Sequence, residues 1–316
     1  MENASASENK ELFRPVARDE IPAAAFRRPT ESYWRIRLHK LLKNKLAVLG
    51  LCLLLLILGL AAVGPHLVPY APSDQSLLMT NLPPSAAHWF GTDDLGRDVW
   101  ARTWAGARIS LLIGFSAAAI DLVLGVLIGS IAGYAAGRGA KGDRIDSALM
   151  RLTEILYSIP YLLVVILLLV VMKPGLLTMI IALSLTGWVG MARIVRGQIL
   201  QLKQNEYVTA ARSLGASHRR IVFRHLLPNA TGIIIVNLTF SIPAAIFAES
   251  FLSFLGLGIQ SPSASWGTMA NDSLGVILSG QWWRLFFPGL LISLTMLAFN
   301  TLGDGLQDAL DPHSKV

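Results

Sequence analysis

The sequence predicts an all-α integral membrane protein with six transmembrane helices. Of its 316 residues, 53% are hydrophobic and only 15% are charged, a balance too apolar for a soluble domain. Apolar runs long enough to cross a bilayer recur along the chain, with polar segments between them. Lysine and arginine concentrate in alternate polar segments, which predicts that these segments and both termini are cytoplasmic.

Charge and cysteine content narrow the class further. The net charge is +7, and basic inner loops account for that sign, so nucleic acid is not an expected partner. The single cysteine, Cys52, lies in an apolar run and can form neither an intramolecular disulfide nor a cysteine-based metal cluster. The polar first 45 residues are too long for a cleavable signal peptide, so the first span should remain as an anchor.

The N-terminal third divides into three parts. Residues 1–45 are expected to form a cytoplasmic arm, disordered over 1–25. Its segment 27–45 mixes basic and apolar side chains, which predicts an amphipathic helix on the inner membrane surface. Alternatively, the basic residues form a cluster that only determines the topology of the first span. Residues 46–68 are the expected first transmembrane helix, and 69–107 an extracytoplasmic loop with several prolines.

Residues 108–312 should hold a five-helix core domain. The expected spans are 111–134, a third ending near 172, 176–191, about 231–257, and 285–301. The basic segment 137–151 is expected to be a cytoplasmic loop. Pro160 should kink the third span, because proline cannot continue the hydrogen-bond ladder.

Two features of the second span bear on packing and function. Gly125, Gly129 and Gly133 recur at four-residue spacing, which predicts close contact with another helix. Asp121 lies about 15 Å along the span, near the membrane midplane. We expect hydrogen bonds from a neighbouring helix to hold this carboxylate; the alternative is a residue that faces a pathway. Glu249, towards the outer end of the fifth span, has the same two interpretations.

The longest polar interruption after residue 110 is 206–229, which predicts two short helices. The first has a small apolar face made of Tyr207, Ala210, Ala211 and Leu214. Gly215 should take the left-handed conformation of a helix C-cap, Ser217 should cap the second helix, and Pro228 should end it. Exposed alanines suit docking into a groove on another protein; alternatively, this is a solvated loop whose arginines only set topology.

This stretch resembles the EAA loop of ATP-binding-cassette (ABC) importer permeases. The matching residues are Ala210, Ala211, Gly215, Leu227 and Pro228. Thr209 stands where the family has its glutamate, His225 stands where it has isoleucine, and Glu206 is a candidate substitute for the glutamate. The resemblance implies a cytoplasmic coupling loop, 196–228, that contacts an ATPase subunit through Glu206, Tyr207, Thr209, Ala210, Ala211, Leu214, Gly215, Ala216, Arg219 and Pro228.

A second motif lies in the outer loop. Its sequence, GTDDLGRD, contributes Gly91, Thr92, Asp93, Gly96, Arg97 and Asp98. The spacing of its aspartates does not fit an EF-hand, so no metal site is expected. The motif resembles the peptide-transporting branch of the permease family, as do the later strings FLGLGI and SWG.

The resemblance, which covers residues 40–312, implies a type I ABC importer permease fold and the role of the C-type permease in an oligopeptide (Opp-type) importer of the bacterial cytoplasmic membrane. Dipeptide and nickel importers of the same family are the alternatives. Implied partners are a homologous B-type permease in a heterodimer, two ABC ATPase subunits, an extracytoplasmic peptide-binding protein, the peptide and membrane lipid. ATP and Mg would bind to the ATPase subunits, and this chain would bind no cofactor.

Two other classes of function fit the residues less well. An intramembrane enzyme would need a catalytic group, but none of the six histidines forms H-E-x-x-H and no G-x-S-x-G motif occurs. The chain also lacks the G-x-x-x-x-G-K-[ST] loop of an ATPase, so we expect no enzyme activity and no catalytic residue. A secondary transporter would need a coupling-ion site, for which only Asp121 is a midplane candidate.

Overall fold

The computed structural model describes residues 33–260 and 262–311. The chain divides into two compact units, 1–39 and 40–316, and helix α2 (Tyr33–Lys43) crosses the boundary between them. The predicted disorder of residues 1–25 and the start of the predicted amphipathic helix lie outside the described residues.

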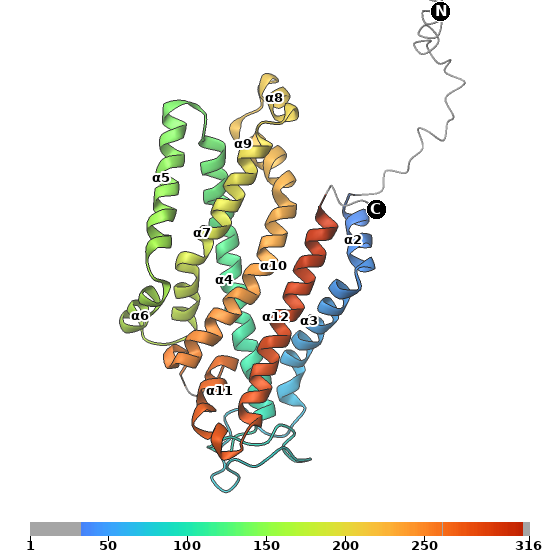
Figure 1. Cartoon of the computed structure of the whole chain (residues 1–316), viewed down its shortest axis with the longest axis vertical. Helices are drawn as coiled ribbons and strands as arrows, with labels where there is room; N and C mark the ends of the chain where they lie inside the picture. The colour runs from blue at the N-terminus through green and yellow to red at the C-terminus, as the bar shows by residue number, and fades with distance from the viewer. Residues whose placement is uncertain (1–32, 261, 312–316) are drawn as a thin grey trace, which may run out of the picture. The chain divides into compact units, whose positions relative to one another are not determined.

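The unit 40–316 is helical (Figure 1). Its longer helices are α3 (Lys45–Val63), α4 (Val99–Ala135), α5 (Gly139–Ser158), α6 (Tyr161–Met172), α7 (Leu176–Leu202), α10 (Leu227–Leu252) and α12 (Trp283–Leu310). Its short elements are η2 (Gly64–His66), α8 (Glu206–Ser213), α9 (His218–Ile221), the π-helices η3 (Val222–Leu226) and η4 (Ser253–Leu257), α11 (Trp266–Asp272) and η5 (Leu274–Ser279).

These helices confirm the predicted fold class. Five are long and apolar enough to cross a membrane, and the bent pair α5–α6 makes a sixth span if it is counted as one. Among the described residues the only β-type pairing is an isolated bridge between Thr92 and Asp98.

The third span is broken, which corrects two expectations. The segment 137–151 is not a loop, because α5 already begins at Gly139 after a turn in which Gly137 and Gly139 have positive φ angles. Pro160 does more than kink the span: α5 and α6 meet at 82°. Ile159 is extended, as a residue before proline prefers, and proline offers no N–H to the preceding turn, so the helix stops and restarts.

The predicted glycine face of α4 packs against α7. A Cβ at Gly125 would meet the side chain of Met191, and one at Gly129 or Gly133 would meet the backbone carbonyl of Ala192 or Arg196. Only glycine permits this approach, and close backbone packing is a main source of helix association in lipid. The prediction of a close helix contact at these positions is therefore confirmed.

Several helix limits differ from those expected. The fourth span does not end near 191, because α7 continues to Leu202, inside the predicted loop 196–228. The second span starts earlier, because Asp98 caps α4 by accepting a hydrogen bond of 2.8 Å from the Ala101 N–H. The expectation that Pro228 ends a helix is wrong: η3 leads directly into α10, where Pro228 occupies the first turn and its missing N–H costs no hydrogen bond. The last helix continues to Leu310, since Gly303 and Gly305 pack against Phe240 and Ala47.

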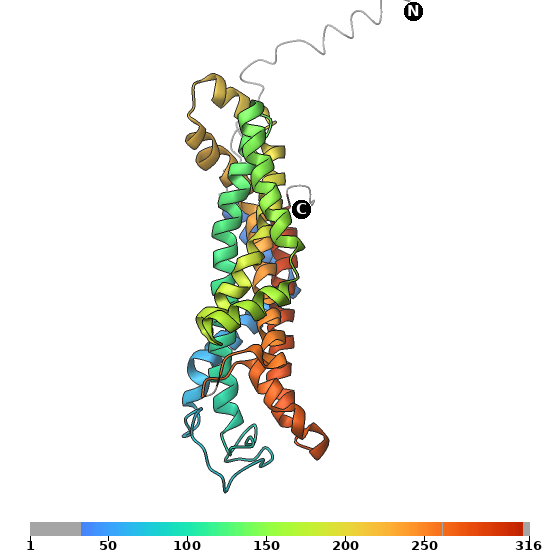
Figure 2. The ribbon, with the colours of Figure 1, turned by 90° about the vertical axis from the view of Figure 1, so that its left-hand side faces the viewer.

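The two ends of the 40–316 unit differ in charge. Figures 1 and 2 place α8 and α9 at one end and the segment 67–98 with α11 towards the other. The α8–α9 end carries Arg138, Lys203, Arg212, Arg219 and Arg220 alongside Glu206 and Asp143, whereas the opposite end carries Asp74, Asp93, Asp94, Asp98 and Asp272 alongside Arg97, Arg102 and Arg284. The excess of basic residues at the α8–α9 end supports a cytoplasmic position for that end.

This orientation can be tested by cysteine labelling. In a Cys52→Ala background, single cysteines at Ser73 and Ser263, both exposed, should react with a membrane-impermeant maleimide in intact cells. A cysteine at the exposed Ser213 in α8 is the control and should react only after lysis. Labelling of Ser213→Cys in intact cells would show that the orientation is the reverse of the one expected.

Candidate coupling site and its supporting clusters

The segment after α7 forms two short helices around a glycine turn. Gly215 has a φ of +77°, and the N–H groups of Gly215 and Ala216 donate to the carbonyls of Arg212 and Ala211 at 3.0 Å each. Ser217 then caps α9, accepting from the Arg220 N–H at 3.4 Å. The predicted left-handed turn and N-cap are thus both present.

One side of this segment is buried and the other is open. Val208 is fully buried in a cluster with Ile221, Leu226, Tyr134 and Ile199. The residues exposed on the other side are Glu206, Tyr207, Thr209, Ala210, Leu214, Gly215 and Arg219, while Ala211 and Ala216 are half-buried. Leu214 is 88% exposed and lies beside the exposed Tyr207 and Ala210. Tyr207, Ala210 and Leu214 therefore form the open apolar face that the helical spacing predicted, with Ala211 at its edge.

A polar cluster ties α9 to the end of α4. The Tyr134 hydroxyl lies 3.0 Å from Nδ1 of His218, and the Arg138 guanidinium lies 2.9 Å from Nε2 of the same ring. The guanidinium also covers the Tyr134 ring at 4.6 Å. These contacts hold the first turn of α9 against α4, so the two elements should move together.

Two further basic residues fasten the same end. The Lys203 ammonium donates to the carbonyl of Gly133 at 3.0 Å and to that of Ala136, closing the C-terminus of α4. Burial lowers the pKa of Lys203, and nearby Arg196 and Arg212 act in the same direction. Arg196 forms a bidentate pair with Asp146, both distances being 2.6 Å, and thereby joins α7 to α5.

The two intramembrane carboxylates have different surroundings. Glu249 is fully buried, and its oxygens accept hydrogen bonds from Ser253 at 2.7 Å and Ser110 at 2.9 Å. This arrangement fits a structural role. Asp121 corrects our expectation: Oδ1 is buried and has no hydrogen-bond partner among the described residues, and the carboxylate faces Gly187 of α7 instead of a donor.

The outer motif folds on itself and caps α4. Asp93 accepts from the Arg97 N–H and side chain at 2.9 and 2.6 Å, and Asp98 lies 2.8 Å from Nδ1 of His88. Gly91 and Gly96 both have positive φ angles, which explains the two glycines of the string. The Thr92 hydroxyl bridges the Met79 carbonyl and the Leu82 N–H at 2.5 and 2.8 Å. The motif therefore fixes the shape of the outer loop.

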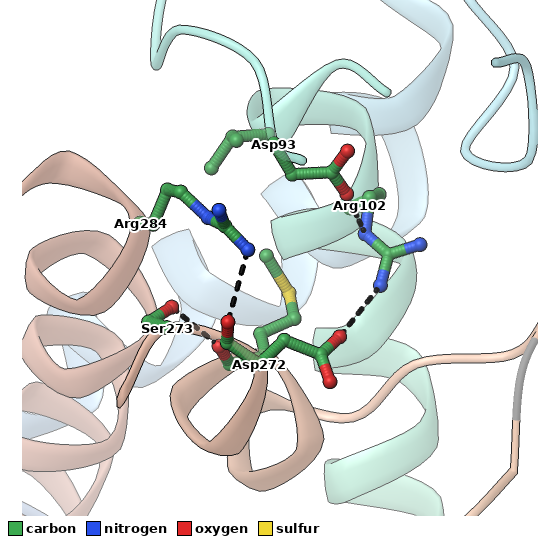
Figure 3. A pocket seen from close by; sticks show the side chains of 7 residues that line it. Asp93, Arg102, Asp272, Ser273 and Arg284 are labelled. Carbon is green, nitrogen blue, oxygen red and sulfur yellow. Dashed lines mark hydrogen bonds and ion pairs between the residues drawn. The ribbon is translucent and has the colours of Figure 1, made fainter. Parts of the chain in front are cut away.

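This folded motif joins α4, α11 and α12 through ionic contacts (Figure 3). Arg102 lies 3.3 Å from Asp93 and 3.6 Å from Asp272, and Arg284 donates to the Asp272 carbonyl at 3.0 Å. Arg284 is only 3% exposed and also reaches Asp94 at 3.2 Å. Burial raises the pKa of the Asp272 carboxyl, while Arg102 opposes that change.

In the described part of the chain, no group of three or more carboxylate, histidine or cysteine side chains could hold a metal ion.

Sequence reasoning located the α8–α9 segment and the outer motif but missed the residues that anchor them. Tyr134, Arg138, Lys203 and Asp146 carry no motif, and their partners lie 50 to 84 residues away. Tyr134 ends the predicted second span, and a tyrosine there suits a membrane interface equally well. No local signal distinguishes such a residue from an anchor.

Comparison with known proteins agrees with this arrangement. A family model described as binding-protein-dependent transport system inner membrane component matches residues 125–316, more than half of the chain. A second, described as N-terminal TM domain of oligopeptide transport permease C, matches residues 32–84.

Relatives and one solved structure extend the match. The dipeptide transport system permease protein DppC of Bacillus subtilis is 62% identical over 92% of this chain and 89% of its own. The oligopeptide transport system permease protein OppC of the same organism is 50% identical over 96% of this chain and 97% of its own. A structure of the MetNI methionine ABC transporter in an inward-facing conformation has a TM-score of 0.54 at 20% identity, covers 65% of this chain and 94% of that one, and shows a common fold. The chain therefore belongs to the family of binding-protein-dependent transport system inner membrane components, as its motifs indicated.

Proposed function

We propose that this chain is a transmembrane permease subunit of an ABC importer that translocates oligopeptides across the cytoplasmic membrane. The main support for this proposal is the α8–Gly215–α9 segment. One side of the segment is buried, and its small apolar face is exposed to solvent. Tyr207, Ala210 and Leu214 together leave a small apolar surface on which a partner could dock. The family match and the peptide-permease relatives support the same function.

The open face is the proposed contact with an ATPase subunit. Glu206, Tyr207, Ala210, Ala211 and Leu214 would enter a cleft on that subunit, with Arg212 and Arg219 at the rim. When ATP closes the ATPase subunits, α8 would be displaced. The His218–Tyr134 contact and the continuous passage from α9 through η3 into α10 would carry that displacement into the spans. Alternating access then follows from a difference in partner affinity between two conformations.

The remaining partners follow from this role. A homologous B-type permease would complete the pathway as a heterodimer, and an extracytoplasmic binding protein would deliver the peptide at the α11 end. ATP and Mg would bind on two separate ATPase subunits, because this sequence has no phosphate-binding glycine loop. Glu249 and the GTDDLGRD motif would serve structure, since the charged side chains of both have partners within the chain.

A dipeptide importer is the second candidate. The observation in its favour is the higher identity to the relative named as a dipeptide permease, 62% against 50% for the relative named as an oligopeptide permease. Both candidates require the same coupling segment and differ in cargo length.

Uptake by a strain that depends on this importer separates the two candidates. We expect growth of an auxotroph on tri-, tetra- and pentapeptides that contain the required amino acid, and loss of that growth when the gene is deleted. Growth on dipeptides alone would establish the second candidate. Unchanged peptide uptake after deletion, in a strain without other peptide importers, would exclude both.

Gly215→Val tests the turn. A β-branched residue tolerates a φ of +77° poorly, so the substitution should destabilise the loop by about 1–2 kcal/mol. The space around Gly215 is open, so the defect would arise from the backbone alone. Membrane insertion should be normal, while ATPase subunits should co-purify in reduced amount. Gly190→Val, at another open glycine but without positive φ, is the control and should leave co-purification unchanged.

Ala211→Trp tests the docking face. The bulk should keep α8 out of the ATPase cleft, so transport should be lost, and the ATPase subunits should either dissociate or hydrolyse ATP without responding to loaded binding protein. The control is the double variant Gln201→Ala and Gln204→Ala, which changes two exposed residues just before α8. It should leave transport and the response of the ATPase subunits unchanged. Transport at the normal rate by Ala211→Trp would mean that α8 is not the coupling element.

A further inference from the structure

A cavity lies between four helical elements at the depth of Asp121. Its volume is about 610 Å³, and α4, α7, α10 and the α5–α6 break all contribute to its wall. The apolar lining includes Ala117, Leu156, Ile159, Leu183, Ala244 and Ala248. The polar lining is sparse: Asp121, Tyr157, Ser158, Tyr161, Thr186 and Ser241. A mostly apolar cavity with a few convergent polar groups is the usual form of a small-molecule site.

Asp121 has the one carboxylate in this lining. The residue is only 8% exposed, and Oδ1 receives no hydrogen bond from the described residues. Gly187 lies directly opposite, and a Cβ there would collide with the carboxylate, so the missing side chain makes room for it. The Tyr161 hydroxyl, at the start of α6, is also buried without a partner among the described residues. Two unpaired polar groups therefore border the same space.

An unpaired carboxylate at this depth needs an explanation. Burying a charged or hydrogen-bonding group without a partner is costly, and intramembrane acids usually face a bundle interior or a pathway. Glu249 shows how the same chain satisfies a structural acid, with serine hydroxyls at 2.7 and 2.9 Å. No lysine, arginine or histidine lines the Asp121 cavity in the described part of the chain, so a counter-charge for an ionised Asp121 would come from a ligand or a partner chain.

The break at Pro160 points to the same place. Non-helical backbone at membrane depth is tolerated where it lines a cavity or is covered by protein, because lipid cannot satisfy its peptide groups. Ser158, Ile159 and Pro160 all border the cavity, beside Tyr161. Their peptide groups can therefore meet water or a polar ligand from this side.

We propose that Asp121 forms a transit site for the α-ammonium group of a peptide, which enters this cavity while it crosses the membrane. This inference rests on the proposed function, and it names the chemical group that the permease itself would recognise. An α-ammonium is the positive charge that peptides with a free N-terminus share whatever their side chains, so one carboxylate suffices. The apolar remainder of the wall accepts side chains without selecting among them.

Photocrosslinking to the assembled importer tests the transit site. p-Benzoylphenylalanine would replace Ala244, an exposed residue in the cavity wall, and the probes would be radiolabelled trialanine and N-acetyl-trialanine. Trialanine should crosslink in the purified importer. Acetylation of the peptide, or Asp121→Asn in the chain, should each lower the yield about tenfold or more, since each removes one charge of a charged hydrogen bond. Glu154→Gln, an exposed acid of α5, is the matched control and should leave the yield unchanged.

The outcomes separate this inference from the proposed function. Equal yields for both peptides, or no crosslink at Ala244 in an importer that transports trialanine, would overturn the transit site and leave the function intact. Absence of any peptide uptake by the unmodified importer would overturn both. The acetylation comparison keeps Asp121 in place, so it decides the question even if the asparagine variant fails to assemble.

Discussion

The close approach of α4 and α7 is the contact on which the rest of the chain depends. In lipid, helices gain little from burying apolar surface, so association relies on backbone proximity, which Gly125, Gly129 and Gly133 permit. The same seam continues to Gly187, where it makes room for the Asp121 carboxylate. At its other end, the carbonyls of Gly133 and Ala136 receive the Lys203 ammonium. One packing surface thus positions both the cavity and the start of the proposed coupling segment.

The buried charged groups of the described residues differ in whether the chain supplies their partners. Glu249, Arg284, Asp93 and Asp98 each have partners within the chain at hydrogen-bond distance, and they bind distant segments into one framework. Such networks are stabilising when every member is satisfied. Eight buried side-chain atoms of the described residues lack a hydrogen-bond partner, and two of them, Oδ1 of Asp121 and the Tyr161 hydroxyl, border the same cavity. The other buried acids of the described residues have partners within the chain, so the unpaired Asp121 beside Tyr161 supports the proposed transit site.

The proposed coupling segment has a buried back and an exposed front. Val208 and Ile221 are fully buried, and His218 contacts Tyr134 and Arg138. The front carries Tyr207, Ala210 and Leu214 into solvent. Transmission of movement requires both properties. A partner bound to the exposed side displaces the spans only if the buried side stays fixed to them. The π-helix η3 continues the chain from this segment into α10 without an intervening loop.

Features that depend on neighbouring residues could be predicted from the sequence. Helical spans, the left-handed Gly215, the Ser217 cap and the glycine face of α4 all follow from backbone sterics and helical period, which act within a few residues. Only the tertiary structure decided the 82° break at Pro160, because the angle depends on what packs against each half. It also paired Arg196 with Asp146 across 50 residues and Ser110 with Glu249 across 139. It left Asp121 unpaired against Gly187, because whether a buried acid finds a donor depends on which helices cross beside it, and residue spacing does not encode that crossing.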